Sequence, residues 1–140
     1  MKRFLGAQYP LQKGPRGIMA PLSGVDQIKA DVLQLLLTNP GERVMLPLYG
    51  TPLKKLMFEP NDPRLASQAK QMIIDSIQMW EPRVEIVNIE VTSNFNTDKL
   101  HFNDPGYESE SILGITIKFY DPEKIDEVQE LELRVPISEF

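Results

Sequence analysis

Acidic side chains are the first candidates for chemistry here, because the 140 residues include no cysteine and a single histidine. A glycosidase-type centre needs two carboxyl groups roughly 5–10 Å apart across a cleft, with apolar surroundings that raise one pKa. Glu42, Glu59 and Glu81 each lie beside apolar residues at the boundary of an expected element. Each also has an arginine nearby, so pairing, turn capping or solvation explains them equally well. A small cell-wall muramidase using Glu59 or Glu81 is therefore the alternative hypothesis.

Other enzyme and cofactor signatures are missing from the sequence. His101 could act as a general base beside Asp98 or Asp104, but it lies in a turn-rich segment without a rigid scaffold, and we interpret it as a surface histidine. The glycines form neither a phosphate-binding loop nor a dinucleotide fingerprint. Without cysteine, disulfides, thiolate zinc sites and cysteine nucleophiles are excluded. We expect no catalytic residue, no metal and no cofactor.

Charge and hydropathy restrict the class of partner. A net charge of −5 argues against a general nucleic-acid binder. The apolar runs are far shorter than the ~20 residues of a membrane span, and Gly6 and Pro10 interrupt the stretch that a signal peptide would need. Four basic residues and no acid precede Asp26. This basic arm could contact nucleic acid or an acidic partner, or could simply be solvated.

Helical periodicity dominates the first part of the chain. Residues 1–22, rich in proline and glycine, read as an extended arm. Ser23 has capping-box spacing ahead of a helix from about Gly24 to Thr38, with Asn39-Pro40-Gly41 as its stop signal. Residues 42–50 suit a short strand or a tight apolar loop, and Thr51-Pro52 opens one or two helical turns. An apolar stripe from Leu65 to Trp80 predicts a further helix, which Pro82 ends.

After Pro82 the apolar period changes to two. The apolar residues change parity near Ile86-Val87, so this strand is either buried on both faces or bulged there. Residues 94–107 read as a loop, and alternation then predicts strands around 113–119 and 131–137. We predict an α+β fold in which N-terminal helices pack on one face of a three- to four-stranded antiparallel sheet. The arm, residues 1–22, would precede a single domain, residues 23–140.

Glu81-Pro82-Arg83 forms a sharp corner between the last helix and the first strand. Proline fixes the turn and leaves an acid and an arginine beside it. The planar guanidinium of Arg83 has five donors and could clamp a partner segment. Alternatively, Glu81 and Arg83 pair with each other and brace the corner.

The last predicted strand is a candidate sheet edge. Leu131, Leu133 and Val135 alternate with charged residues, and charges on an edge strand oppose wrong pairing. An edge strand can accept a strand from another protein through its free backbone groups. We therefore predict partner binding at Leu131, Leu133 and Val135 as well as at the corner.

Several motifs in fixed order resemble the baseplate wedge family of contractile phage tails, which is related to a baseplate component of type VI secretion systems. The resemblance spans roughly residues 23–92. It rests on a leucine-rich helix followed by Thr38-Asn39-Pro40-Gly41-Glu42-Arg43, on Pro47 to Gly50, on Leu53 to Pro60, and on Trp80-Glu81-Pro82-Arg83-Val84.

The resemblance implies a structural, non-enzymatic role. Family members sit in the baseplate wedge beside the tube and hub, and provide a template for the first ring of tail sheath. Expected partners are other wedge proteins and the sheath protein, with tube or hub proteins as further neighbours. The expected location is the virion tail baseplate, after assembly in the host cytoplasm. The family's Glu-Pro-Arg corner, here Glu81, Pro82 and Arg83, contacts other wedge proteins. Some relatives carry a lysozyme-like label, and that activity is not carried over.

Overall fold

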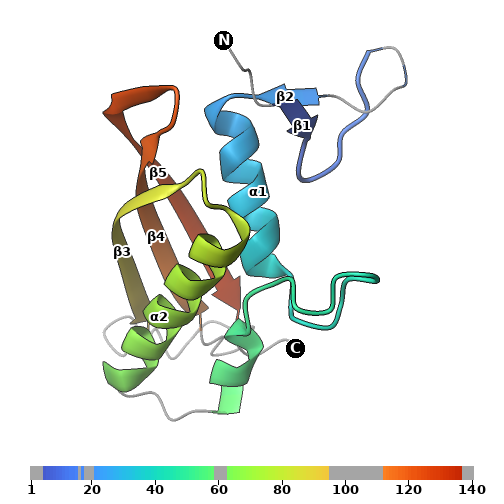
Figure 1. Cartoon of the computed structure of the whole chain (residues 1–140). Helices are drawn as coiled ribbons and strands as arrows, with labels where there is room; N and C mark the ends of the chain where they lie inside the picture. Colours follow the sequence, from blue (N-terminus) through green and yellow to red (C-terminus); the bar gives the residue numbers. More distant parts are fainter. Residues whose placement is uncertain (1–4, 16, 18–20, 59–62, 95–111, 137–140) are drawn as a thin grey trace, which may run out of the picture.

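The computed structural model describes residues 5–15, 17, 21–58, 63–94 and 112–136. Two short strands precede the first helix, a 3-10 helix and the second helix follow, and three long strands complete the described chain (Figure 1). The predicted turn at 60–63 and the predicted loop at 94–107 fall almost entirely outside the described residues. The elements are β1 (Leu5–Ala7), β2 (Pro21–Ser23), α1 (Val25–Leu37), η1 (Leu53–Phe58), α2 (Pro63–Trp80), β3 (Glu85–Asn94), β4 (Ile112–Asp121) and β5 (Lys124–Pro136).

Helix α1 forms where the apolar period predicts it, but its N-terminal cap differs from the prediction. Ser23 does not cap the helix, because it is the last residue of β2 and pairs with Leu5. The N-cap is Gly24, which has φ of 67° and offers no side-chain hydrogen bond. At the other end, the amide and the hydroxyl of Thr38 both donate to the Gln34 carbonyl. The helix therefore ends just before the Asn39-Pro40-Gly41 stop signal.

Helix α2 carries the apolar stripe that the sequence predicts. Leu65, Ala69, Ile73 and Ile77 are buried, and Trp80 is half-buried at the end. The Glu81 amide still donates to the Ile77 carbonyl, and Pro82 then prevents a further turn. Because Trp80 is the last helical residue, the next three residues form the corner into the sheet.

The sheet is antiparallel with the order β3-β4-β5, so among the described strands β4 is central and β5 lies at an edge. Phe119, Ile117, Ile115 and Leu113 of β4 all point to the buried face. The register of β3 against β4 shifts between Ile86 and Asn88, which confirms the bulge. Val87 is the extra residue at this shift, and its side chain is 44% exposed.

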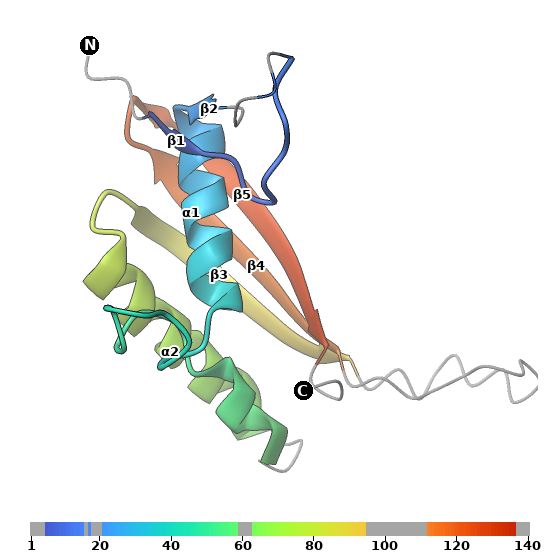
Figure 2. The same ribbon diagram turned by 90° about the vertical axis from the view of Figure 1, so that its right-hand side faces the viewer.

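Both helices lie on the same side of this sheet (Figure 2). Their buried residues form one apolar core with η1 and the inward-facing residues of β3 and β4, while exposed Glu90, Glu130 and Glu132 lie on the strands without joining it. This arrangement confirms the predicted α+β fold, with three strands in the main sheet.

The N-terminal strands form a separate two-stranded sheet against α1. Strand β1 pairs with β2 in antiparallel register, with Gly6 opposite Leu22. Gly6 lies directly against the side chain of Gln27 on α1, so closely that a methyl group at this position would overlap the Gln27 amide. The absence of a side chain at Gly6 therefore permits this close approach of the arm to the helix.

Candidate partner-binding site

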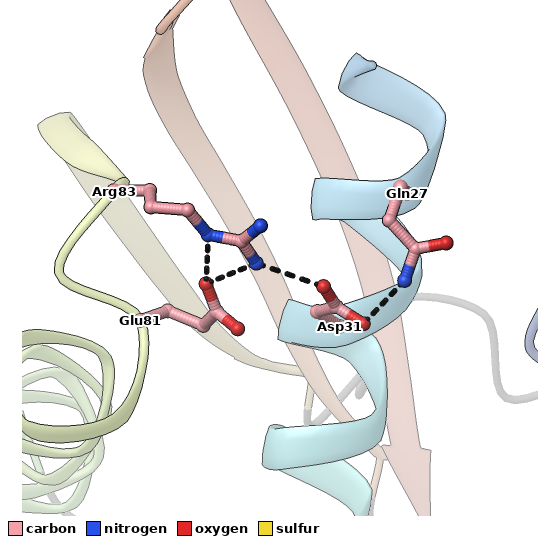
Figure 3. A network of polar contacts seen from close by, with 4 residues as sticks. All are labelled: Gln27, Asp31, Glu81 and Arg83. Atoms are coloured by element: carbon pink, nitrogen blue, oxygen red, sulfur yellow. Dashed lines mark hydrogen bonds and ion pairs between the residues drawn. The ribbon is translucent and has the colours of Figure 1, made fainter. Parts of the chain in front are cut away.

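The Glu81-Pro82-Arg83 corner is joined to α1 by a network of side chains (Figure 3). Arg83 donates from both Nε and Nη2 to Glu81 Oε2, at 3.1 and 2.7 Å. Its Nη2 also donates to Asp31 Oδ2 at 2.9 Å. The side-chain amide of Gln27 donates in turn from Nε2 to Asp31 Oδ1 at 2.7 Å. The corner is thus held in one geometry by an arginine that bridges two carboxylates.

The network is partly shielded from water. The side chain of Glu81 is 15% exposed, that of Arg83 32% and that of Asp31 26%, whereas Pro82 is exposed. Burial alone would lower the pKa of the Arg83 guanidinium, but the hydrogen bonds to Glu81 and Asp31 outweigh it and raise that pKa. Arg83 therefore stays charged throughout the physiological range, and the corner presents an ordered proline beside a partly exposed cation.

The second predicted site, on β5, consists of strand residues that pair with β4. Leu131 and Leu133 pair in register with Ile117 and Ile115, and their half-buried side chains pack on the core. Val135 pairs with Leu113. On the same strand Glu130, Glu132 and Arg134 are exposed. The side chains of Leu131 and Leu133 thus serve the fold, and β5 is an edge strand among the described strands.

Two residues of the corner network were not predicted from the sequence. Gln27 and Asp31 are four residues apart, which places them on one helical face, and this spacing is the signal that was available. No sequence pattern indicates that Asp31 meets Arg83, because that contact joins positions 52 residues apart.

The enzyme candidates do not assemble into a catalytic pair within the described residues. Glu42 is exposed and accepts hydrogen bonds from Asn39 and Lys54, while Glu81 accepts two hydrogen bonds from Arg83. Glu59 and His101 lie outside the described residues. The described part of the chain contains no group of acidic or histidine residues arranged to hold a metal ion. In the same part, no helix has the length and apolar character to span a bilayer.

Comparison with solved structures identifies the fold. The chain superimposes on a Geobacter sulfurreducens protein, provisionally named a tail lysozyme, with a TM-score of 0.65 and 19% identity, covering 84% of this chain and 96% of that one. A chain of the anti-feeding prophage baseplate superimposes with a TM-score of 0.63 and 16% identity, covering 97% of this chain and 87% of that one. A chain of the type VI secretion baseplate complex superimposes with a TM-score of 0.57 and 19% identity, covering 80% of this chain and 92% of that one.

Sequence comparison identifies the family. Baseplate protein W of Escherichia phage P2 is 28% identical over 75 residues, a match that spans 54% of this chain and 65% of that relative. Residues 22–103 match the family described as Baseplate wedge protein gp25, and this range includes α1, α2 and the whole Glu81-Pro82-Arg83 corner. With more than half of its length matched, this chain belongs to the Baseplate wedge protein gp25 family of contractile tail structures.

Proposed function

We propose that this chain is a non-enzymatic wedge subunit that binds other wedge proteins at its corner and templates the first ring of tail sheath at β5. Tube or hub proteins are its further neighbours. Its place is the baseplate of a tail or tail-like particle, which it joins during assembly in the host cytoplasm. The observation that carries the proposal is the position of β5 at an edge of the sheet.

The edge of β5 can accept a strand. In an antiparallel sheet an edge strand directs alternate pairs of backbone donors and acceptors outward, and an added strand satisfies them. Strand β5 runs over 13 residues, and exposed Glu130, Glu132 and Arg134 protect it from wrong pairing. A sheath subunit that adds one strand here would obtain its orientation from the register of β5.

The corner supplies the contact with other wedge proteins. Its shape is fixed before binding, because Arg83 is already bonded to Glu81 and Asp31. A preformed surface loses little conformational entropy when a partner docks. Pro82 and the exposed third of Arg83 are the groups that such a partner would contact, while Glu81 and Asp31 act as positioning residues.

Particle assembly tests both contacts. In a host that produces the particle, deleting this chain should yield tubes without sheath, and the wild-type chain should restore sheathed tails seen by electron microscopy. Arg83→Ala should fail to restore them and should weaken binding to a purified wedge protein about tenfold or more. Lys70→Ala, which removes an exposed cation from α2, should restore them fully. Normal sheathed tails without the chain would refute the proposal.

Hydrogen exchange tests the β5 contact separately. In the isolated protein, amides that point outward from β5 should exchange fast, while those bonded to β4 stay protected. Addition of the sheath protein should protect the outward set. If protection instead appears along β3, the wrong edge has been assigned.

A cell-wall assay separates this proposal from a muramidase. The purified chain should not clear a peptidoglycan suspension. Clearing that is lost in Glu81→Gln or Glu59→Gln would establish the enzyme instead.

A further inference from the structure

The segment between α1 and η1 carries an exposed apolar surface that the proposed function does not use. Val44, Met45 and Leu48 are 86%, 90% and 70% exposed, and Leu46 is 42% exposed. We call residues 43–48 the apolar loop. It projects beyond the helices as an isolated excursion of the chain (Figure 1). A cluster of this kind on a convex protrusion is typical of an interaction site rather than of ordinary surface.

The apolar loop is held in a fixed conformation. The Gly41 amide donates to the Pro47 carbonyl at 2.7 Å and closes its base, and the Leu46 amide donates to the Arg43 carbonyl at 3.3 Å. Glu42, just before the loop, bonds to Asn39 and to Lys54. These contacts fix the backbone while leaving the apolar side chains in water. A rigid loop of this kind loses little entropy on binding.

Met45 adopts a backbone conformation that disfavours its own side chain. Its φ is 70°, in the left-handed region where glycine is favoured. At 90% exposure the Met45 side chain does nothing for the core. The position therefore carries both backbone strain and an exposed apolar group, a combination that points to a function outside the isolated fold.

We propose that the apolar loop inserts into an apolar pocket with an acidic rim on a neighbouring baseplate protein. This inference rests on the proposed function, because it presupposes baseplate partners. The loop protrudes, so its partner must be concave. Arg43 indicates the charge of the rim: its guanidinium lies 4.5 Å from the Tyr49 ring centre, and no carboxylate of the described residues forms an ion pair with it.

The apolar loop also adjoins the corner. Tyr49, just after the loop, packs edge-on against Trp80 with ring centres 5.3 Å apart, and Trp80 directly precedes Glu81. One partner could therefore contact both features. The corner would supply polar contacts, and the loop would supply the apolar anchor that dominates binding.

A membrane surface fits the apolar loop less well than a protein does. Residues 44–48 contain no aromatic side chain of the kind that favours the lipid headgroup region, and Arg43 is the one basic residue of the loop. The whole chain carries a net charge of −5, which opposes approach to anionic lipid.

Met45→Gly and Leu48→Ser test the inference in the full chain. Met45→Gly removes the apolar group and relieves the strained backbone, so its melting temperature should equal or exceed that of the wild type. Each variant should weaken binding to a purified baseplate protein encoded beside this chain by about tenfold. The control is Leu11→Ser, which removes a 67% exposed apolar group from the segment between β1 and β2 and should bind normally.

Photo-cross-linking identifies the occupant. p-Benzoylphenylalanine placed at position 45 in assembling cells should form an adduct with one baseplate protein, at a segment of apolar residues flanked by Asp or Glu. Placed at exposed position 11, it should not form that adduct. Equal adducts at both positions, or flotation of the wild-type chain with phosphatidylglycerol vesicles, would overturn the inference. If Arg83→Ala abolishes binding while both loop variants bind normally, the loop inference fails and the proposed function stands. If none of the three affects binding, both fail.

Discussion

Arg83 Nη2 lies 2.9 Å from Asp31 Oδ2, and this contact joins the corner after α2 to the middle of α1. The same nitrogen lies 2.7 Å from Glu81 Oε2. One guanidinium therefore bridges an acid of the corner and an acid of the first helix, and Gln27 holds Asp31 in place. The orientation of the corner depends on the position of α1 through this bridge.

Replacing Asp31 with Asn should weaken this bridge and leave the Glu81–Arg83 pair in place. The side chains are partly exposed, so we expect a loss of only about 0.5–1.5 kcal/mol in the free energy of unfolding. Urea unfolding would measure it. Asp75→Asn is a matched control, because Gln71 donates to Asp75 with the same spacing on exposed α2, and it should cost less than about 0.5 kcal/mol. Equal losses would show that Arg83 contributes nothing to the role of Asp31.

Gly6→Ala should loosen the arm from α1. The added methyl group overlaps the Gln27 amide, and Gln27 is buried and bonded to Asp31, so it cannot move away without cost. Trypsin should cut faster at exposed Lys13 in this variant, at unchanged protease concentration. Exposed Ala7 offers the control, since Ala7→Ser adds a similar volume without the overlap. Equal cutting of Gly6→Ala and wild type would exclude a tight contact at Gly6.

Gly50→Ala should destabilise the protein far more than Gly41→Ala. Both residues have positive φ, at 127° and 93°. A Cβ at Gly50 would overlap the Thr38 carbonyl oxygen and lie 2.9 Å from the Asn39 carbonyl carbon, whereas a Cβ at Gly41 meets nothing within 4 Å. We expect about 1 kcal/mol at Gly41 from the backbone alone, and more than about 2 kcal/mol at Gly50. Thermal and urea unfolding of the two variants would test this ratio.

The sequence predicted those elements whose apolar period is regular. Three- and four-residue steps located α1 and α2 because each buries one stripe, and alternation located β4 and β5 because their sheet has one polar face. The parity change at Ile86-Val87 predicted the bulge, although two-sided burial was equally compatible with it. The prediction that Ser23 caps α1 was wrong, because Ser23 pairs with Leu5 in the N-terminal sheet and this pairing determines its conformation.

The sequence patterns did not predict contacts between residues of different elements. The bracing of the corner was predicted only as a Glu81–Arg83 pair, because Asp31 belongs to a different helix. Residues 42–50 read as a strand or as a tight apolar loop, and the pattern alone did not indicate that Val44 and Met45 are in water. Apolar content predicts burial only when a second element lies close enough to cover it.

Acid should destabilise the base of the apolar loop, because protonation of Glu42 weakens its hydrogen bonds with Asn39 and Lys54. Hydrogen bonds from the side chain and backbone of Asn39, followed by that from Lys54, lower the pKa of the Glu42 carboxyl below its ordinary value of 4.5. A carboxyl whose folded pKa is lowered stabilises the fold fully above its unfolded pKa, and this contribution is lost as the pH falls through the folded pKa.

The difference in urea midpoint between wild type and Glu42→Gln should therefore be largest above pH 4.5 and should vanish in stronger acid. All other acids are common to the two proteins, so their titration cancels in this difference. Trp80, the only tryptophan, packs against Tyr49 at the end of the loop, and its fluorescence reports the same transition locally. A difference that stays constant from about pH 7 to about pH 3 would mean that the charge of Glu42 does not support the loop.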